Sequence, residues 1–209
     1  MNRTNYAAIG AIIAWFALLG QYYLIIENRA ASVAETTVRY FSYFTILTNI
    51  VVAVFFTAHL LGSNSSLKKF FQKPGIVTAV TLYITIVGLV YQFVLRQSWN
   101  PQGFQKIIDE LLHSVVPAVV IVYWFLYEDK TKPQWKQVPA WLIYPALYLA
   151  FILIRGAFSG YYPYFFVDVA NAGYPKVIVN SGLLLLAFSC FAALFVVLAK
   201  WMAKRKTLA

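Results

Sequence analysis

The chain has 209 residues, of which 61% are hydrophobic and only 11% are charged. A soluble domain carries about 25% charged residues, so this composition excludes an ordinary water-soluble fold and indicates that apolar surface faces lipid. The formal net charge of +10 comes from short clusters between long apolar runs rather than from one basic face, so we expect no nucleic-acid partner.

Six apolar segments are each long enough to cross a bilayer as an α-helix, which takes about 20 residues. In chain order they are Tyr6–Ile26, Val38–Leu61, Ile76–Leu95, Ile107–Tyr127, Val138–Phe158 and Val177–Trp201. The linkers between them are short and polar. The sequence therefore predicts an all-α, polytopic integral membrane protein whose six transmembrane helices form one bundle, a single domain over residues 1–209.

Lysine and arginine are concentrated at one set of segment ends, which holds eleven of the 17 basic residues. These are Arg3, Lys68, Lys69, Lys73, Lys130, Lys132, Lys136, Lys200, Lys204, Arg205 and Lys206. Cytoplasmic loops of membrane proteins carry an excess of Lys and Arg. We therefore expect both the N-terminus and the C-terminus on the cytoplasmic side.

The second segment carries hydroxyl and amide side chains that lipid does not solvate. Ser42, Thr45 and Asn49 are spaced by three and four residues, which places them on one helix face, and Thr48 is a further candidate hydroxyl. Such groups often serve as contacts between helices. A polar stripe that ends in asparagine is less ordinary and indicates a polar pocket.

The third segment has a polar face that includes Gly88, Gln92 and Arg96. A glycine on this face allows a neighbouring helix to approach closely. Gln92 and Arg96 need polar partners, which we expect at the outer end of the bundle.

The fourth segment combines ionisable residues with a proline. Asp109, Glu110 and His113 lie within about one helical turn, so one face can present a histidine beside carboxylates. Pro117 has no N–H for the carbonyl of His113, four residues earlier. We expect a kink at His113 that leaves this carbonyl free for a side chain or water.

The fifth segment ends in Arg155, and an aromatic-rich loop follows from Gly160 to Lys176. The loop is either an interfacial aromatic belt or a lid over a cavity. In the second case we expect Asp168 to pair with Arg155 or with Arg96.

Thr45 and His113 are expected to lie at the same depth in the membrane. At about 1.5 Å per residue, Thr45 and His113 each lie roughly 10 Å below the outer ends of their helices. His59 lies in the other leaflet, roughly 20 Å from Thr45. This separation argues against a two-histidine haem or metal site, and Cys190 is the only cysteine, so we expect no metal and no cofactor.

A threonine and a histidine at one depth are suited to acyl transfer. A threonine hydroxyl becomes a useful nucleophile when a neighbouring base takes its proton, and a partly buried, neutral histidine can be that base. Asn49, one turn from Thr45, could donate a hydrogen bond to the oxyanion. An apolar cleft suits a substrate with acyl chains, so the expected reaction is ester hydrolysis within the membrane.

Three stretches of the sequence carry a family resemblance. They are Tyr40 to Asn49, Leu112 to Pro117, and Tyr144-Pro145 through Arg155-Gly156 to Gly160-Tyr161-Tyr162-Pro163-Tyr164. They resemble the bacterial branch of the androgen-induced, FAR-17a-like family of integral membrane proteins, and the resemblance covers nearly the whole chain.

The resemblance implies a hydrolase of fatty acid esters of hydroxy fatty acids. Family members use a membrane-embedded threonine nucleophile and a histidine, which fall on Thr45 and His113. It also implies a bacterial plasma membrane and a membrane lipid or lipid ester as the partner.

Two other functions remain open on the sequence alone. A non-enzymatic lipid-binding or transport protein could use the same polar pocket, with Arg96, Asp109, Glu110, Arg155 and Asp168 steering a head group. Alternatively, the polar stripes could serve only as contacts between helices in a structural or assembly protein.

Overall fold

The computed structural model describes residues 1–208, and the side chains of residues 1–205. Among these residues every regular element is a helix. The helices form two compact units, Met1–Lys132 and Pro133–Ala209.

The first unit begins with a long helix and contains two helices that change into π-helix. Its elements are α1 (Arg3–Glu27), α2 (Val33–Tyr40), α3 (Phe44–Leu60), α4 (Ser66–Phe71), α5 (Ile76–Val90), the π-helical η1 (Tyr91–Leu95), the 3₁₀-helical η2 (Arg96–Ser98), α6 (Gly103–Glu110), the π-helical η3 (Leu111–Val115) and α7 (Val116–Tyr127).

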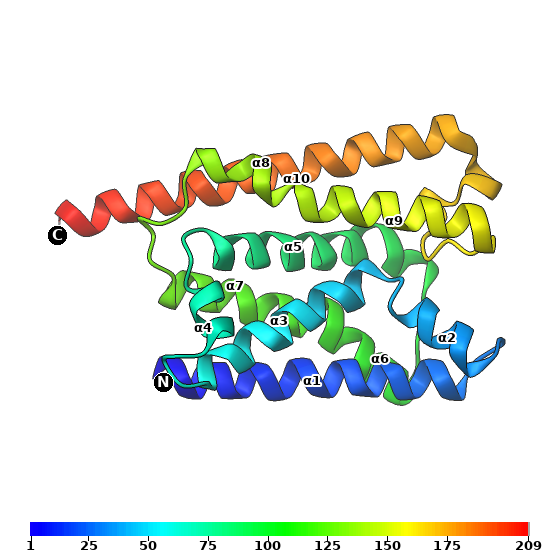
Figure 1. Cartoon of the computed structure of the whole chain (residues 1–209), viewed down its shortest axis with the longest axis horizontal. Coiled ribbons are helices and arrows are strands. Elements are labelled where there is room, and N and C mark those ends of the chain that lie inside the picture. The colour runs from blue at the N-terminus through cyan, green and yellow to red at the C-terminus, as the bar shows by residue number, and fades with distance from the viewer. Residues whose placement is uncertain (209) are drawn as a thin grey trace. The chain divides into compact units, whose positions relative to one another are not determined.

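Helix α1 packs along α3, as Figure 1 shows. The buried side of α1 consists largely of small residues, among them Ala7, Gly10, Ala14 and Ala17. A Cβ atom on Gly10 would lie 2.7 Å from the ring of Phe56 on α3. Small residues let two helix backbones approach closely when lipid offers no hydrophobic drive for association.

Helix α5 lies against α3 and α7 and is buried from Val77 to Gly88. Its threonines do not leave polar groups unpaired: Thr81 and Thr85 donate to the carbonyls of Val77 and Thr81. A buried hydroxyl that bonds the carbonyl four residues earlier is compatible with an apolar environment.

The predicted second span is a bent pair of helices rather than one straight helix. Helices α2 and α3 meet at 71°. Ser42 lies in the turn between them and donates to the carbonyl of Val38. The Tyr40 hydroxyl donates to the carbonyl of Leu18 on α1, which fixes the end of α2. Ser42 therefore does not share a helix face with Thr45, which corrects the predicted three-residue stripe.

The second unit consists of two long helices joined by the aromatic loop. Its elements are the 3₁₀-helical η4 (Trp135–Gln137), α8 (Val138–Trp141), α9 (Ile143–Ser159), the 3₁₀-helical η5 (Phe165–Val167) and α10 (Val169–Leu208). Helix α9 runs alongside α10 (Figure 1). Helix α10 is interrupted at Gly173, which has a φ of 76°. Glycine adopts this positive φ without the steric cost that a Cβ atom would add.

The aromatic loop packs on the helices of its own unit. The ring of Tyr162 occupies the space that a side chain at Gly156 would need. Arg155 donates to the carbonyl of Tyr161, and Asn180 on α10 donates to the carbonyl of Phe166. The residues of the loop are thus held within the unit by both of its long helices.

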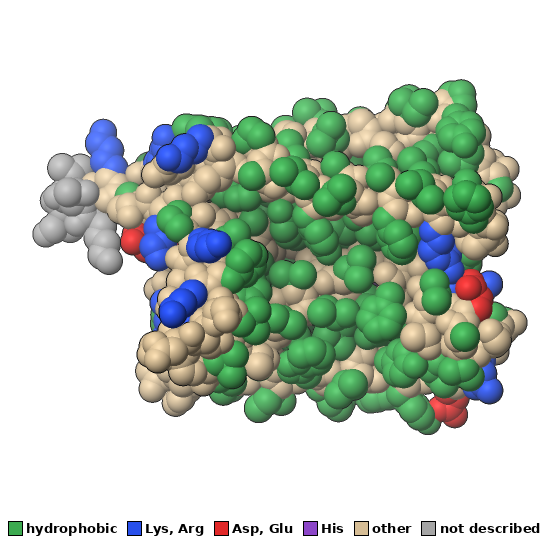
Figure 2. Space-filling view, viewed as in Figure 1, with side chains coloured by type: hydrophobic (Ala, Val, Ile, Leu, Met, Phe, Trp, Pro, Cys, Tyr) green, Lys and Arg blue, Asp and Glu red, His purple; other side chains and the backbone are tan. Residues whose placement is uncertain are grey.

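Among the described residues, five helices are long and apolar enough to cross a membrane, and a sixth span results if the bent pair counts as one. The five are Arg3–Glu27, Ile76–Ser98, Gly103–Tyr127, Trp135–Ser159 and Val169–Arg205. Figure 2 shows apolar side chains along the sides of the helices and Lys and Arg toward their ends. These helices indicate a membrane-embedded, all-helical protein, and the predicted helices of five segments are confirmed.

Candidate functional site

The candidate site lies in the first unit, where two π-helical turns of the described chain come together. Helix α5 continues into η1, and α6 continues through η3 into α7. A π turn closes i→i+5 bonds and is frequent at functional sites. The proline explains the second turn, because Pro117 has no N–H to donate to the carbonyl four residues before it (His113) or five residues before it (Leu112).

Gly88 allows α5 to approach this turn. A Cβ atom on Gly88 would lie 3.2 Å from the carbonyl oxygen of His113 and 3.4 Å from the Cβ of Pro117. The close approach expected of this glycine is therefore present, and its neighbour is the loosened turn of the histidine helix.

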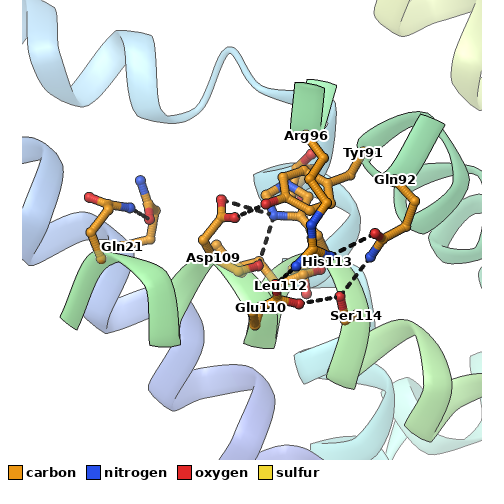
Figure 3. Close-up of polar contacts among 12 residues, drawn as sticks. Gln21, Tyr91, Gln92, Arg96, Asp109, Glu110, Leu112, His113 and Ser114 are labelled. Carbon is orange, nitrogen blue, oxygen red and sulfur yellow. Dashed lines mark hydrogen bonds and ion pairs between the residues drawn. The ribbon is translucent and has the colours of Figure 1, made fainter. Parts of the chain in front are cut away.

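The imidazole of His113 is held by Asp109, as Figure 3 shows. Its Nδ1 lies 2.9 Å from the backbone oxygen of Asp109 and 3.3 Å from the carboxylate Oδ1. Both side chains are largely buried, with exposed fractions of 13% and 8%. With its hydrogen on Nδ1, the ring donates to Asp109 and keeps Nε2 as the nitrogen that can accept a proton.

Tyr91 contacts both members of this pair. Its ring stacks on the imidazole, with centroids 4.1 Å apart and planes inclined by 14°. Its hydroxyl donates to Oδ2 of Asp109. Tyr91 was not among the predicted site residues, although its spacing of three from Gly88 places it on the polar face of the third segment.

A ring of polar side chains lies at the exposed edge of the same two π turns. Arg96 forms an ion pair with Glu110 and donates to Gln92 Oε1 at 2.7 Å. Gln92 donates to the Ser114 hydroxyl at 2.8 Å, and Ser114 donates to Glu110 Oε2 at 2.6 Å. Gln92 and Arg96 thus have the polar partners that the sequence led us to expect. Ser114 is a second residue that sequence reasoning did not place in the site.

Asn49 connects α3 to the histidine turn. Its Nδ2 donates to the carbonyl of Thr45 at 2.8 Å and to the carbonyl of Leu112 at 3.3 Å. Both amide hydrogens are therefore used, and Asn49 does not offer the oxyanion donor that we expected. Its Oδ1 is fully buried and has no hydrogen-bond partner among the described residues.

Thr45 lies in the first turn of α3, on the helix face that Asn49 turns toward η3. It is buried, as are Ser42 and Thr48. The imidazole of His113 bonds the backbone oxygen of Asp109, and Asn49 joins the two helices through the carbonyls of Thr45 and Leu112. The structure thus brings the helix that carries Thr45 against the turn that carries His113.

Arg155 and Asp168 have local roles in the second unit. The Arg155 guanidinium lies over the ring of Tyr161 and donates to its carbonyl. Asp168 caps the start of α10 by accepting from the backbone and side-chain amides of Asn171. Asp168 therefore caps a helix in its own unit rather than pairing with Arg155, and its alternative partner Arg96 lies in the other unit, so that pairing stays a prediction.

His59 belongs to a separate cluster. Its Nε2 lies 2.7 Å from the Tyr123 hydroxyl and 3.0 Å from Arg3, while its Nδ1 lies 3.0 Å from the carbonyl of Phe55. Among the described residues no group of three or more His, Cys, Asp or Glu side chains could hold a metal ion.

Comparisons of the chain with protein-family models, with curated proteins and with solved structures find no match. The resemblance to the FAR-17a-like family therefore stays a prediction that rests on its motifs. Any function has to be inferred from the geometry of the site.

Proposed function

We propose that this protein is an intramembrane hydrolase of a lipid ester, with Thr45 as the nucleophile and His113 as the general base. The observation that carries the proposal is the Asp109–His113 pair. A buried imidazole whose Nδ1 is fixed on the backbone oxygen of Asp109, with the carboxylate Oδ1 3.3 Å away, keeps Nε2 for proton transfer, which is the arrangement of an oriented base.

The position of α3 supports the choice of nucleophile. The bonds from Asn49 to Thr45 and Leu112 set the first turn of α3 against the residue that precedes His113. The start of a helix carries partial positive charge. Negative charge that develops on a carbonyl attacked by Thr45 would be stabilised there.

The proposed reaction has two steps. His113 Nε2 takes the proton of the Thr45 hydroxyl while Oγ1 attacks the ester carbonyl, and the alcohol leaves with that proton. Water then attacks the acyl-threonine with His113 again as base, and the carboxylic acid and the threonine hydroxyl are released. General-base assistance of this kind contributes about 10²–10⁴-fold in rate.

The proposal requires Thr45 and His113 to come into hydrogen-bond contact when substrate binds. Catalytic hydrogen bonds are often long without substrate and tighten in the complex. The second candidate function is a non-enzymatic lipid-binding or transport protein, and the partly exposed ring of Arg96, Gln92, Ser114 and Glu110 favours it, because these polar groups could bind a head group.

The proposed membrane placement completes this description. The bent pair counts as the sixth span, the six spans form one bundle, and both termini lie in the cytoplasm of a bacterium. The excess of Lys and Arg at one set of ends supports this orientation.

Turnover of lipid esters by the purified protein tests the proposal. Branched fatty acid esters of hydroxy fatty acids and simple long-chain esters are presented in detergent, and released fatty acid is measured. We expect Thr45→Ala and His113→Ala each to abolish release while Thr48→Ala, the matched hydroxyl on the same helix, retains it. Ligand-induced stabilisation without any product would favour the binding protein instead.

A further inference from the structure

We propose that Tyr91 is a positioning residue for the His113 base, acting through its ring on the imidazole and through its hydroxyl on Asp109. This inference rests on the proposed function. It adds a third side chain, from a different helix, to the pair on which general-base catalysis depends.

Both carboxylate oxygens of Asp109 contact side chains of the site. Oδ1 lies 3.3 Å from His113 Nδ1, and Oδ2 accepts from the Tyr91 hydroxyl. A carboxylate that is bonded at only one oxygen can rotate, and the other oxygen then moves away from its partner. The Tyr91 hydroxyl therefore fixes the orientation in which Oδ1 meets the imidazole.

The ring of Tyr91 fixes the plane of the imidazole. The rings are nearly parallel at 4.1 Å, so rotation of the imidazole out of its plane would collide with the tyrosine. Tyr91 is itself buried. Beyond it along the chain, η1 and η2 are held by the bonds of Gln92 to Ser114 and of Arg96 to Glu110. The ring of Arg96, Gln92, Ser114 and Glu110 thus fixes the position of η1 relative to η3. Because Tyr91 lies on η1, its ring and hydroxyl are held in place against His113 and Asp109.

Two substitutions separate the two contacts of Tyr91. Tyr91→Phe keeps the stacked ring and removes only the bond to Asp109. Tyr91→Leu removes both. Tyr83→Phe is the matched control, because it removes a hydroxyl from the same helix about 12 Å away.

Steady-state kinetics on a lipid ester measure the effect. We expect Tyr91→Phe to lower kcat roughly tenfold, the scale of one lost hydrogen bond to a charged group, with KM little changed. Tyr91→Leu should lower kcat further, and Tyr83→Phe should leave it as in the wild type.

A readout that needs no catalysis measures the contact of Tyr91 with the histidine pair separately from turnover. His113 becomes the only histidine in a His59→Gln protein, so its ring can be observed by nitrogen-15 NMR with labelled histidine. We expect the Nδ1 proton to exchange with solvent slowly in this protein and faster when Tyr91→Phe is added.

The possible outcomes separate the two claims. An active wild type whose Tyr91→Phe variant has unchanged kcat and unchanged proton exchange would overturn the role of Tyr91 alone. A wild type without turnover would overturn the proposed function and with it this inference, even if Tyr91 still slows the exchange of the Nδ1 proton.

Discussion

The side-chain amide of Asn49 donates to the carbonyl of Leu112, 63 residues away in the chain, at 3.3 Å. The carbonyl of Leu112 is the one that the π turn directs toward Pro117, which has no N–H. Asn49 therefore supplies a hydrogen bond that the helix cannot, and in doing so it ties α3 to the turn that carries His113.

Replacing Asn49 tests this tie. Asn49→Leu should lower the free energy of unfolding by about 1–3 kcal/mol, because the buried carbonyl of Leu112 loses its donor. The measurement is the unfolding equilibrium in mixed detergent micelles. Ser189→Ala, which removes an exposed hydroxyl bonded within α10, is the control and should change stability by less than about 0.5 kcal/mol. Equal effects of the two changes would contradict the tie.

Gly88→Ala should separate α5 from the histidine turn. The added methyl group would lie 3.2 Å from the carbonyl oxygen of His113, and overpacking of this kind costs about 1–3 kcal/mol. Thermal unfolding in detergent measures the loss. Gly182→Ala is the matched control, since a Cβ atom there meets nothing within 4 Å. A Gly88→Ala protein as stable as this control would show that the close approach is absent.

The ion pair of Arg96 and Glu110 should contribute little to stability. Their side chains are 43% and 30% exposed, and exposed pairs contribute about 0.2–1 kcal/mol and are screened by salt. A double-mutant cycle with Arg96→Gln and Glu110→Gln, measured at low and high salt, gives the coupling. A coupling well above this range that persists in high salt would contradict the solvent-exposed geometry.

Glu128, in the loop after α7, should make stability depend on pH. Burial raises the pKa of its carboxyl above the usual value, and the opposing charges of Lys132, Lys130 and Arg3 offset only part of this effect. The folded protein therefore binds this proton more tightly than the unfolded chain. Ionisation of Glu128 costs stability, and the cost is absent below the ordinary carboxyl pKa and grows as pH rises above it.

The comparison that checks this is thermal unfolding of wild type and Glu128→Gln at pH 4 and pH 7.5. We expect similar stability at the lower pH and a more stable variant at the higher pH. The exposed Glu27→Gln controls for the loss of one negative charge. A variant that is less stable than the wild type only at pH 7.5 would reverse the sign and refute the assignment.

The helices could be predicted because a long apolar segment in a membrane can adopt few structures other than an α-helix. A buried backbone in lipid must satisfy its own hydrogen bonds, so long apolar segments such as Ile76–Leu95 form helices. The bend between α2 and α3 could not be foreseen, because residues 41–43 contain neither glycine nor proline. It depends on tertiary contacts such as the bond from Tyr40 to the carbonyl of Leu18.

The site was predicted in its residue types but not in its connections. Spacing along one helix brought Asp109, Glu110 and His113 together, and Pro117 correctly indicated a loosened turn. The extra residue of the π turn shifted the freed carbonyl that Asn49 uses from His113 to Leu112. Tyr91 could not be connected to Asp109 without the register between α5 and α6, which the sequence does not encode locally.

The central claim, an oriented His113 that activates Thr45, is tested most directly by covalent labelling. The purified protein is treated with a fluorophosphonate, and the modified residue is located by mass spectrometry in the wild type and in His113→Ala. The proposal predicts a phosphonylated Thr45 in the wild type and almost none in the variant. Label on another residue, or on Thr45 to the same extent without His113, would contradict it.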